Sequence, residues 1–172
     1  MSTRIPFKAG SQLVAMSSLE LLLAAATYSS LGVVLPFMVM DLEWNWAQAG
    51  FGFTVLGAVT GVASSVPPLL IRRLGVRNTV LIGGLLASLG LYLLHGVNSL
   101  PQYYIAAAIC GLAYPMMASI PTTFLVSRLF QRQSTALGVA ATISGMGTVV
   151  GPLMVLGVLA LQGQTWRNYW EY

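Results

Sequence analysis

The stretch Ala47–Arg77, AQAGFGFTVLGAVTGVASSVPPLLIRRLGVR, decides the class of fold to which this chain belongs. Up to Ile71 it contains no charged side chain, and it is long enough to cross a bilayer as a helix, which takes about 20 apolar residues. Pro67–Pro68 lie near the end of this run, where a helix can stop at little cost. A basic loop with Arg72–Arg73 and Arg77 follows, and such a loop is typical of the point where a membrane helix ends.

The composition of the whole chain also indicates a membrane protein. Of the 172 residues, 56% are hydrophobic and only 7% are charged. A soluble domain carries roughly a quarter charged residues, so a chain this poor in charge is solvated by the lipid bilayer rather than by water. The net charge of +4 comes from small basic groups between apolar stretches, which indicates orientation in a membrane and no binding of nucleic acid.

Charged and turn residues divide the chain into about five apolar spans. The sequence therefore predicts an all-α, polytopic bundle of transmembrane helices in a single transmembrane domain over residues 1–172. The first apolar run is too long for the core of a cleavable signal peptide, so we expect it to be retained. Residues 168–172 indicate the start of a sixth span, and we expect the chain to be an incomplete part of a larger protein. The predicted spans cover residues 11–40, 47–71, 79–94, 102–126 and 135–161.

The distribution of basic residues predicts the orientation of the spans. Lys and Arg gather in the cytoplasmic loops of membrane proteins. The basic amino terminus and the basic loops after the second and fourth spans fall on one side, opposite Asp41 and Glu43. We therefore expect a multi-pass protein of the cell (plasma) membrane with a cytoplasmic amino terminus. The basic residues on that side are Arg4, Lys8, Arg72, Arg73, Arg77, Arg128 and Arg132, and Arg167 lies on the other.

Glu20 needs an explanation because it lies inside the first predicted span. A charged residue at the centre of a membrane helix costs about 2.5–3.5 kcal/mol on insertion scales, and such residues usually face a cavity or a partner. Glu20 is therefore our candidate for binding a coupling proton or the transported solute. The alternative is a Glu at the membrane interface, in a span that begins near Leu21.

Five further polar residues are candidates for the wall of a water-accessible cavity. Three lie on or beside the helical stripe that contains Glu20. Two lie in the fourth span, which Pro115 and Pro121 interrupt, and broken membrane helices often border a binding cavity. The alternative for the Ser and Thr residues is a hydrogen bond to their own helix backbone. The candidates are Ser17, Thr27, Tyr28, Tyr114 and Thr122.

The sequence contains no pattern that supports an enzyme. There is no phosphate-binding glycine loop and no Cys/His spacing for a metal, and His95 is the single histidine. The single cysteine, Cys110, lies in an apolar stretch and is most simply a packing residue. We therefore expect no enzymatic activity, no metal and no cofactor.

The basic loop after the second span resembles the signature cytoplasmic loop of the major facilitator superfamily, Gly-x-x-x-Asp-Arg/Lys-x-Gly-Arg-Arg/Lys. The matching residues are Arg73, Gly75 and Arg77, whereas Pro68, Arg72 and Val76 replace the first Gly, the Asp and a basic residue. The resemblance implies a charge relay between this loop and neighbouring helices, and the replaced Asp departs from that relay.

The fifth span is similar to the antiporter motif of the same superfamily, Gly-x8-Gly-x3-Gly-Pro-x2-Gly-Gly. Independently of any family, a GxxxG pattern predicts that two membrane helices approach closely. The last two glycines of the motif are replaced by Val155 and Leu156. The matching residues are Gly138, Gly147, Gly151 and Pro152.

Other stretches are similar to particular branches of the superfamily. In the fourth span Gly111 is kept, but Ala107 stands where proton-coupled drug exporters carry an Arg, which argues against that branch. The residues of Pro121–Phe130, followed by Ala136–Gly138 and Trp166–Arg167, resemble the monocarboxylate and oxalate–formate porters.

The resemblance implies a fold of twelve helices in two six-helix halves, with the solute bound between the halves. This chain is then most of the amino-terminal half, and spans one, two, four and five border the cavity. We expect a secondary active carrier, a symporter or antiporter, that moves a small organic solute such as an organic anion by alternating access. Its expected partners are the solute, protons and the missing carboxy-terminal half. The alternative is a non-transporting five-span membrane subunit that binds a partner protein through its helices.

Overall fold

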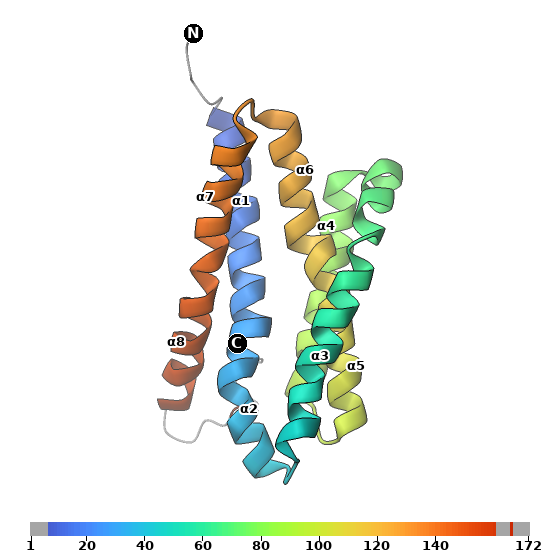
Figure 1. Cartoon of the computed structure of the whole chain (residues 1–172), viewed down its shortest axis with the longest axis vertical. Helices are drawn as coiled ribbons and strands as arrows, with labels where there is room; N and C mark the ends of the chain where they lie inside the picture. Colours follow the sequence, from blue (N-terminus) through green and yellow to red (C-terminus); the bar gives the residue numbers. More distant parts are fainter. Residues whose placement is uncertain (1–6, 161–165, 167–172) are drawn as a thin grey trace.

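The computed structural model describes residues 7–160 and 166, and within these ranges the chain is helical apart from short turns. Five helical spans run up and down the bundle in succession (Figure 1). Each is long and apolar enough to cross a membrane, so the prediction of an all-α polytopic bundle is confirmed. The predicted start of a sixth span at 168–172 lies outside the described residues. The five spans are Ala9–Asp41, Trp46–Ala63, Val66–His95, Leu100–Leu129 and Gln133–Ala160.

Turns and two π-helical segments, η1 and η2, divide the spans into the labelled elements (Figure 1). The first span contains η1, the fourth contains η2, and the fifth is interrupted at Met146. The element bounds are α1 Phe7–Ala24, η1 Ala25–Ser29, α2 Ser30–Asp41, α3 Trp46–Ala63, α4 Val66–His95, α5 Leu100–Tyr114, η2 Pro115–Ser119, α6 Ile120–Leu129, α7 Gln133–Gly145 and α8 Gly147–Ala160.

The first and fourth spans form the centre of the bundle. About half of the most apolar part of each is buried inside the protein, compared with about a fifth for the other three spans. The outer spans instead expose large apolar side chains, as the lipid environment allows. Examples are Leu81, Leu85 and Tyr92 on α4 and Val149, Leu153 and Leu156 on α8.

The entry into α3 is fixed by a capping box. The Asn45 side chain accepts a hydrogen bond of 2.9 Å from the backbone N–H of Ala47, and the backbone N–H of Asn45 donates to Gln48 Oε1 at 3.3 Å. These two bonds satisfy backbone donors that the first turn of a helix leaves without partners. The acidic turn after Asp41 therefore leads directly into the second span.

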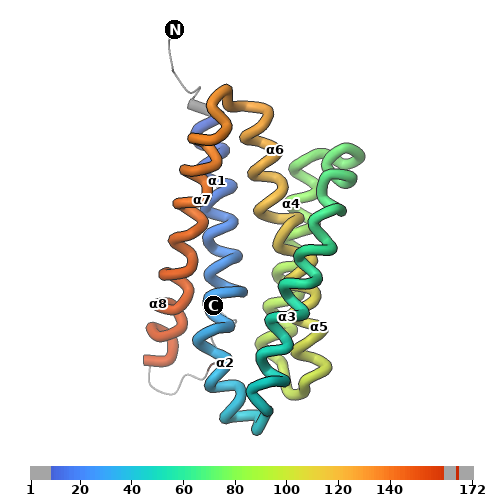
Figure 2. Tube along the Cα trace, viewed as in Figure 1, coloured from blue at the N-terminus to red at the C-terminus, as the bar shows by residue number. Residues whose placement is uncertain are grey.

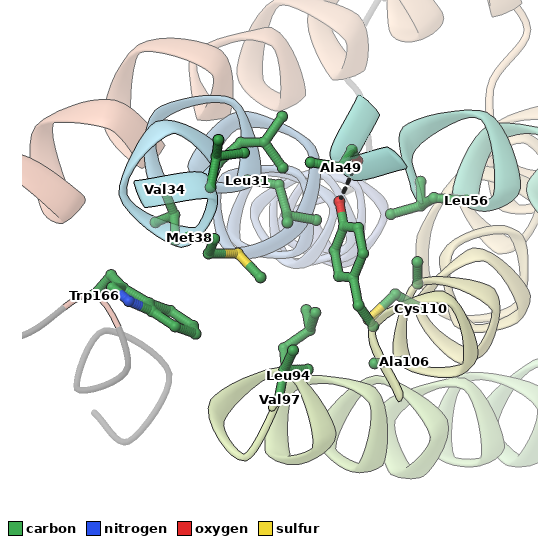
Figure 3. Close-up of a cluster of buried hydrophobic side chains, with 14 of the residues drawn as sticks. Leu31, Val34, Met38, Ala49, Leu56, Leu94, Val97, Ala106, Cys110 and Trp166 are labelled. Carbon is green, nitrogen blue, oxygen red and sulfur yellow. Dashed lines mark hydrogen bonds between the residues drawn. The ribbon is translucent and has the colours of Figure 1, made fainter. Parts of the chain in front are cut away.

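The largest cluster of buried side chains joins α2, α3, α4 and α5 near one end of the bundle (Figure 3). Tyr103 lies at its centre, and its hydroxyl donates a hydrogen bond of 3.2 Å to the backbone oxygen of Ala49. The Tyr103 ring lies against Gly52, where any Cβ would overlap it. Tyr103 can therefore be buried in this position only because residue 52 is a glycine.

Glycines bring α4 and α5 into close contact. A Cβ on Gly83 would lie 2.6 Å from the backbone nitrogen of Met117, and one on Gly90 would lie 2.6 Å from Cys110 Sγ. The two contacts show that residues 76–95 of α4 run antiparallel to the fourth span. On the other side of α5, a Cβ on Gly111 would lie 2.6 Å from the backbone oxygen of Leu56 in α3.

The connection between the second and third spans differs in detail from the sequence prediction. Pro67 and Pro68 were expected to end a helix, but they lie in the first turn of α4 and begin one. Prolines suit this position because the first backbone N–H groups of a helix have no partner within it. The helix is then broken at Gly75, whose φ of 82° is a conformation that glycine adopts readily.

The two ends of the bundle differ in charge. The beginning of α1 and the α6–α7 connection lie at the same end, and the α2–α3 connection lies at the other (Figures 1 and 2). The first of these ends carries the exposed Arg128 and Arg132. The opposite end carries Asp41, whose Oδ2 accepts a hydrogen bond of 3.2 Å from Trp166 Nε1. This bond links Trp166 to the end of the first span.

Candidate solute-binding site

The two central spans carry the local irregularities of the bundle. Each contains a π-helical segment of five residues, η1 in the first span and η2 in the fourth. A π-helical segment interrupts the regular i→i−4 hydrogen bonds, and such segments are frequent at functional sites. Pro115 opens η2, because a proline has no N–H to donate to the preceding turn. Tyr28 lies inside η1, and Tyr114 directly precedes η2.

These two tyrosines meet between the spans. Their ring centroids lie 5.2 Å apart with an interplanar angle of 83°, an edge-to-face contact. The hydroxyl oxygens of Tyr28 and Thr60 lie 2.9 Å apart. Because Thr60 donates its own hydroxyl proton to the backbone oxygen of Leu56 at 2.8 Å, Tyr28 is the donor to Thr60. The first, second and fourth spans are thus joined by polar groups at one point.

Glu20 adds a carboxylate to this group of hydroxyls. It is half-buried on α1, and its carboxylate lies within electrostatic range of the Tyr114 hydroxyl. Among the described residues, it is the one carboxylate that lies within a span rather than at its end. We call the set Glu20, Tyr28, Thr60 and Tyr114 the polar junction. It offers one carboxylate and three hydroxyls in surroundings that are otherwise apolar.

The other predicted cavity residues are buried in helix packing. Thr27 donates to the backbone oxygen of Leu23 at 2.6 Å, and Thr122 donates to that of Ala118 at 2.8 Å. Both bonds are to the residue's own helix, which is the alternative that the sequence left open for them. Ser17 is also fully buried, and its hydroxyl has no hydrogen-bond partner among the described residues.

The residues of the signature-like loop lie at the basic end of the bundle. Arg73, Gly75 and Arg77 are all exposed. A side chain at Gly75 would meet nothing within 4 Å, so the positive φ alone accounts for a glycine there. The loop contains no carboxylate with which its arginines could pair. The charge relay that the resemblance implies therefore has no acidic member within the loop itself.

The glycine motif of the fifth span is divided by the structure into two parts. A Cβ on Gly147 would lie 2.5 Å from the backbone oxygen of Leu21, and one on Gly151 would lie 2.7 Å from that of Ala25. These two glycines therefore allow α8 to pack directly on the first span, as their GxxxG spacing predicts. Gly138, in contrast, has open space within 4 Å of its Cβ position, and Pro152 lies inside α8.

Sequence reasoning missed Thr60 and both π-helical segments. A single Thr in an apolar span bonds its own backbone by default, and only its proximity to Tyr28, 32 positions earlier, distinguishes it. Pro115 was the available signal for η2. For η1 the sequence Ala25–Ser29 contains no proline or glycine that could have marked the irregularity.

Comparison with known proteins gives consistent matches along the chain. A family model described as Major Facilitator Superfamily matches residues 19–170. Monocarboxylate transporter 14 of Mus musculus is 31% identical over 137 residues, which cover 76% of this chain and 26% of that protein. Monocarboxylate transporter 13 of Rattus norvegicus is 30% identical over 140 residues, which cover 81% of this chain and 32% of that protein.

A human relative shows the same pattern of coverage. Monocarboxylate transporter 12 of Homo sapiens is 28% identical over 126 residues, 72% of this chain and 24% of that protein. The chain therefore spans between 24% and 32% of the length of these three relatives. Each of the three is named as a transporter rather than as an enzyme.

Proposed function

This chain belongs to the Major Facilitator Superfamily, and from that membership we propose that it is most of one half of a secondary carrier that moves a small organic solute by alternating access. The chain's share of the length of its relatives supports this proposal, because about a third of a two-half carrier is somewhat less than one half. The remaining helices would then supply the opposite wall of the central cavity. Transport requires both walls, since the solute must be released alternately on either side.

The polar junction is the observation that carries the proposal. A half-buried carboxylate is expensive within a membrane, and it is retained most readily where it binds an ion or a solute. Here Glu20 lies within electrostatic range of Tyr114, whose ring contacts that of Tyr28, and both central spans are irregular beside these tyrosines. The protons of Tyr28 and Thr60 are already donated within the bundle, so the Tyr114 hydroxyl is the group that can donate to a solute carboxylate, and Glu20 can accept a proton or a solute cation.

We infer small monocarboxylates as the class of solute. The relatives carry that class in their names, and organic anions are also the class that the sequence favoured. The basic residues of the third span, Arg72, Arg73 and Arg77, are exposed and lie near its beginning, and none of them belongs to the polar junction. The polar junction itself therefore offers no cation for an anionic solute. Protonation of Glu20 would remove a repulsive negative charge from the path of the anion. Proton symport is therefore the mode that best fits the polar junction.

The orientation follows from the basic end of the bundle. The exposed Arg73 and Arg77 lie near the beginning of α4, and Arg128 and Arg132 lie at or beside the α6–α7 connection, at the end of the bundle where α1 begins (Figure 1). By the positive-inside bias, we assign this end to the cytoplasm and the Asp41 end to the outer side. The carrier would then act in the cell membrane, with Glu20 nearer the cytoplasmic side than Tyr28.

The test is uptake by the complete carrier that contains this sequence, reconstituted into proteoliposomes. Radiolabelled lactate should enter faster when a pH gradient, acidic outside the vesicle, is imposed, and Glu20→Gln should lower this proton-driven uptake at least tenfold. Tyr92→Phe, which alters an exposed tyrosine on the outer face of α4, is the matched control and should leave uptake unchanged. Unchanged proton-driven uptake in the Glu20→Gln carrier would remove the coupling role.

One observation favours a different function, a non-transporting subunit that binds a partner within the membrane. Gly50, Gly57 and Gly61 on α3 have open space within 4 Å of their Cβ positions, so another helix could approach this face closely. A carrier uses such a face for its second half, whereas a subunit uses it for another protein. Stable co-purification of one fixed partner, together with no uptake of any monocarboxylate, would favour the subunit.

A further inference from the structure

A groove opens on the surface of the bundle at its basic end. Its volume is about 390 Å³, and eight residues from α1, α4 and α6 line it. Six of the eight are apolar, and the two polar residues are Gln12 and Arg77. None of the four residues of the polar junction lines the groove, and its nearest lining residue on α1, Met16, lies four residues, or about 6 Å along the helix axis, before Glu20. The apolar lining residues are Ala15, Met16, Val76, Val80, Leu81 and Leu125.

The position of the groove along the bundle corresponds to the boundary between headgroups and acyl chains. The first span is 33 residues long, so it extends for about 50 Å, whereas the hydrocarbon core of a bilayer is about 30 Å thick. Residues near its ends must therefore lie among lipid headgroups. Gln12 lies close to one such end, and Leu125 lies in the last turns of α6. Arg77 lies in the first turn after the break at Gly75.

The charges around the groove favour an anion. Arg77 is exposed and forms no ion pair with the other residues that the structure describes. Within the described ranges, the carboxylates other than Glu20 are Asp41 and Glu43, and both lie at the opposite end of the bundle. Arg128 lies one turn beyond Leu125, which lines the groove, and adds positive charge at the same end. An anionic headgroup would therefore meet cations and no competing acid.

We propose that this groove is a binding site for an anionic phospholipid, whose phosphate pairs with Arg77 and whose acyl chain lies against the apolar wall. A guanidinium suits a phosphate because it can donate two parallel hydrogen bonds. Gln12 can donate a further hydrogen bond to the headgroup or to the ester region. The proposal depends only on insertion of the chain in a membrane, so it stands or falls independently of the transported solute.

The test is native mass spectrometry of the purified full chain with phosphatidylglycerol or phosphatidylcholine of the same acyl chains. We expect phosphatidylglycerol to be retained at least fivefold more tightly than phosphatidylcholine. Arg77→Gln should abolish this preference, and Arg77→Lys should keep part of it. The matched control is Arg132→Gln, which removes the same charge from the same end but does not line the groove. It should lower the preference by less than twofold.

A second pair of variants tests the acyl part of the site. Ala15→Trp places a large ring in the groove and should lower retention of phosphatidylglycerol at least fivefold. Val14→Trp makes the same change on the neighbouring exposed position, outside the groove, and should have little effect. The proposal is overturned if Arg77→Gln and Arg132→Gln act equally, which would indicate surface charge alone. It is also overturned if Ala15→Trp leaves retention unchanged, which would mean that the lipid binds elsewhere or that other protein occupies the groove.

Discussion

Two regions of the molecule differ in the partners of their buried polar groups. One is the region where α5 packs against α3 and α4, and the other is the polar junction. In the first region, which we call the scaffold, the buried polar Tyr103 has its hydroxyl bonded to a backbone oxygen, and glycines allow helix backbones to touch. In the polar junction, a half-buried carboxylate lies within electrostatic range of Tyr114, and Tyr114 contacts Tyr28 where the two central spans have irregular helical segments. The scaffold satisfies the Tyr103 hydroxyl internally, whereas in the junction only Tyr28 and Thr60 donate to protein groups within the described part of the chain, and Glu20 and Tyr114 are available to an external ligand.

This difference indicates where stability and function lie in the molecule. Substitutions in the scaffold should lower stability, because they break close packing that has no alternative arrangement. Removal of the carboxylate from the junction should raise stability while transport is lost, because functional sites commonly retain groups that do not favour the folded state. The sign of the change in unfolding free energy therefore distinguishes the two regions.

The largest effect is expected from Gly83→Ala in the scaffold. The new Cβ would lie 2.6 Å from the backbone nitrogen of Met117, so α4 and the fourth span would have to separate. We expect the free energy of unfolding to fall by about 3 kcal/mol, the upper range for overpacking. The measurement is reversible unfolding of the chain in mixed micelles with increasing sodium dodecyl sulfate.

Its control is the adjacent Gly84→Ala, whose Cβ has open space within 4 Å. This variant should unfold at the same detergent fraction as the wild type or slightly above it, because Ala favours a helix over Gly. Equal losses at positions 83 and 84 would contradict the prediction, because helix propensity favours Ala at both positions and the contact with Met117 exists only at position 83.

An effect of opposite sign is expected from Glu20→Met in the polar junction. The change replaces a half-buried carboxylate by an apolar side chain of similar length, and we expect the free energy of unfolding to rise by about 1 to 2 kcal/mol. The same micelle assay gives this value, and circular dichroism should show unchanged helix content. A loss of stability would assign Glu20 to the scaffold and argue against the contrast between the regions.

The smallest effect concerns the bond between Tyr28 and Thr60. Hydrogen bonds between membrane helices contribute about 0.6 kcal/mol on average, so Tyr28→Phe and Thr60→Val should each cost little. A double-mutant cycle of the two changes should give a coupling energy of about 0.6 kcal/mol. The cycle is measured by the same unfolding assay, with Tyr104→Phe and Thr60→Val as an uncoupled reference pair. Zero coupling would show that the two hydroxyls do not act together.

The fold was largely predictable from the sequence because the relevant signals are long and redundant. Five apolar runs, separated by charges, predicted the bundle of helices that the structure confirms. Local features of the backbone were harder to predict from the sequence. A Pro–Pro pair suits either the position after a helix or the first turn of the next one, and a glycine permits a positive φ without requiring it, so the sequence did not decide the backbone at Pro67, Pro68 and Gly75.

The candidate site was predictable only in part. Glu20 could be identified because a carboxylate in an apolar run is rare, and Tyr114 because prolines follow it. Nothing in the sequence connects Glu20 with Tyr114, since their proximity depends on how the first and fourth spans cross. Thr60 and Thr122 are equivalent as sequence signals, yet one meets a tyrosine from another span and the other bonds only its own helix.

The π-helical segment η1 also fixes the rotational phase of the first span. Its extra residue per turn means that conversion of Ala25–Ser29 to α-helix would turn the part before it by about 100° relative to the part after it. Glu20 would then leave Tyr114, while Met38 could remain in the cluster shown in Figure 3. A change in the backbone hydrogen bonds of this one segment would therefore rotate the first part of the span relative to the second. A one-residue deletion within η1 would remove the extra residue and leave a continuous α-helix in the present phase, so the span could no longer rotate in this way.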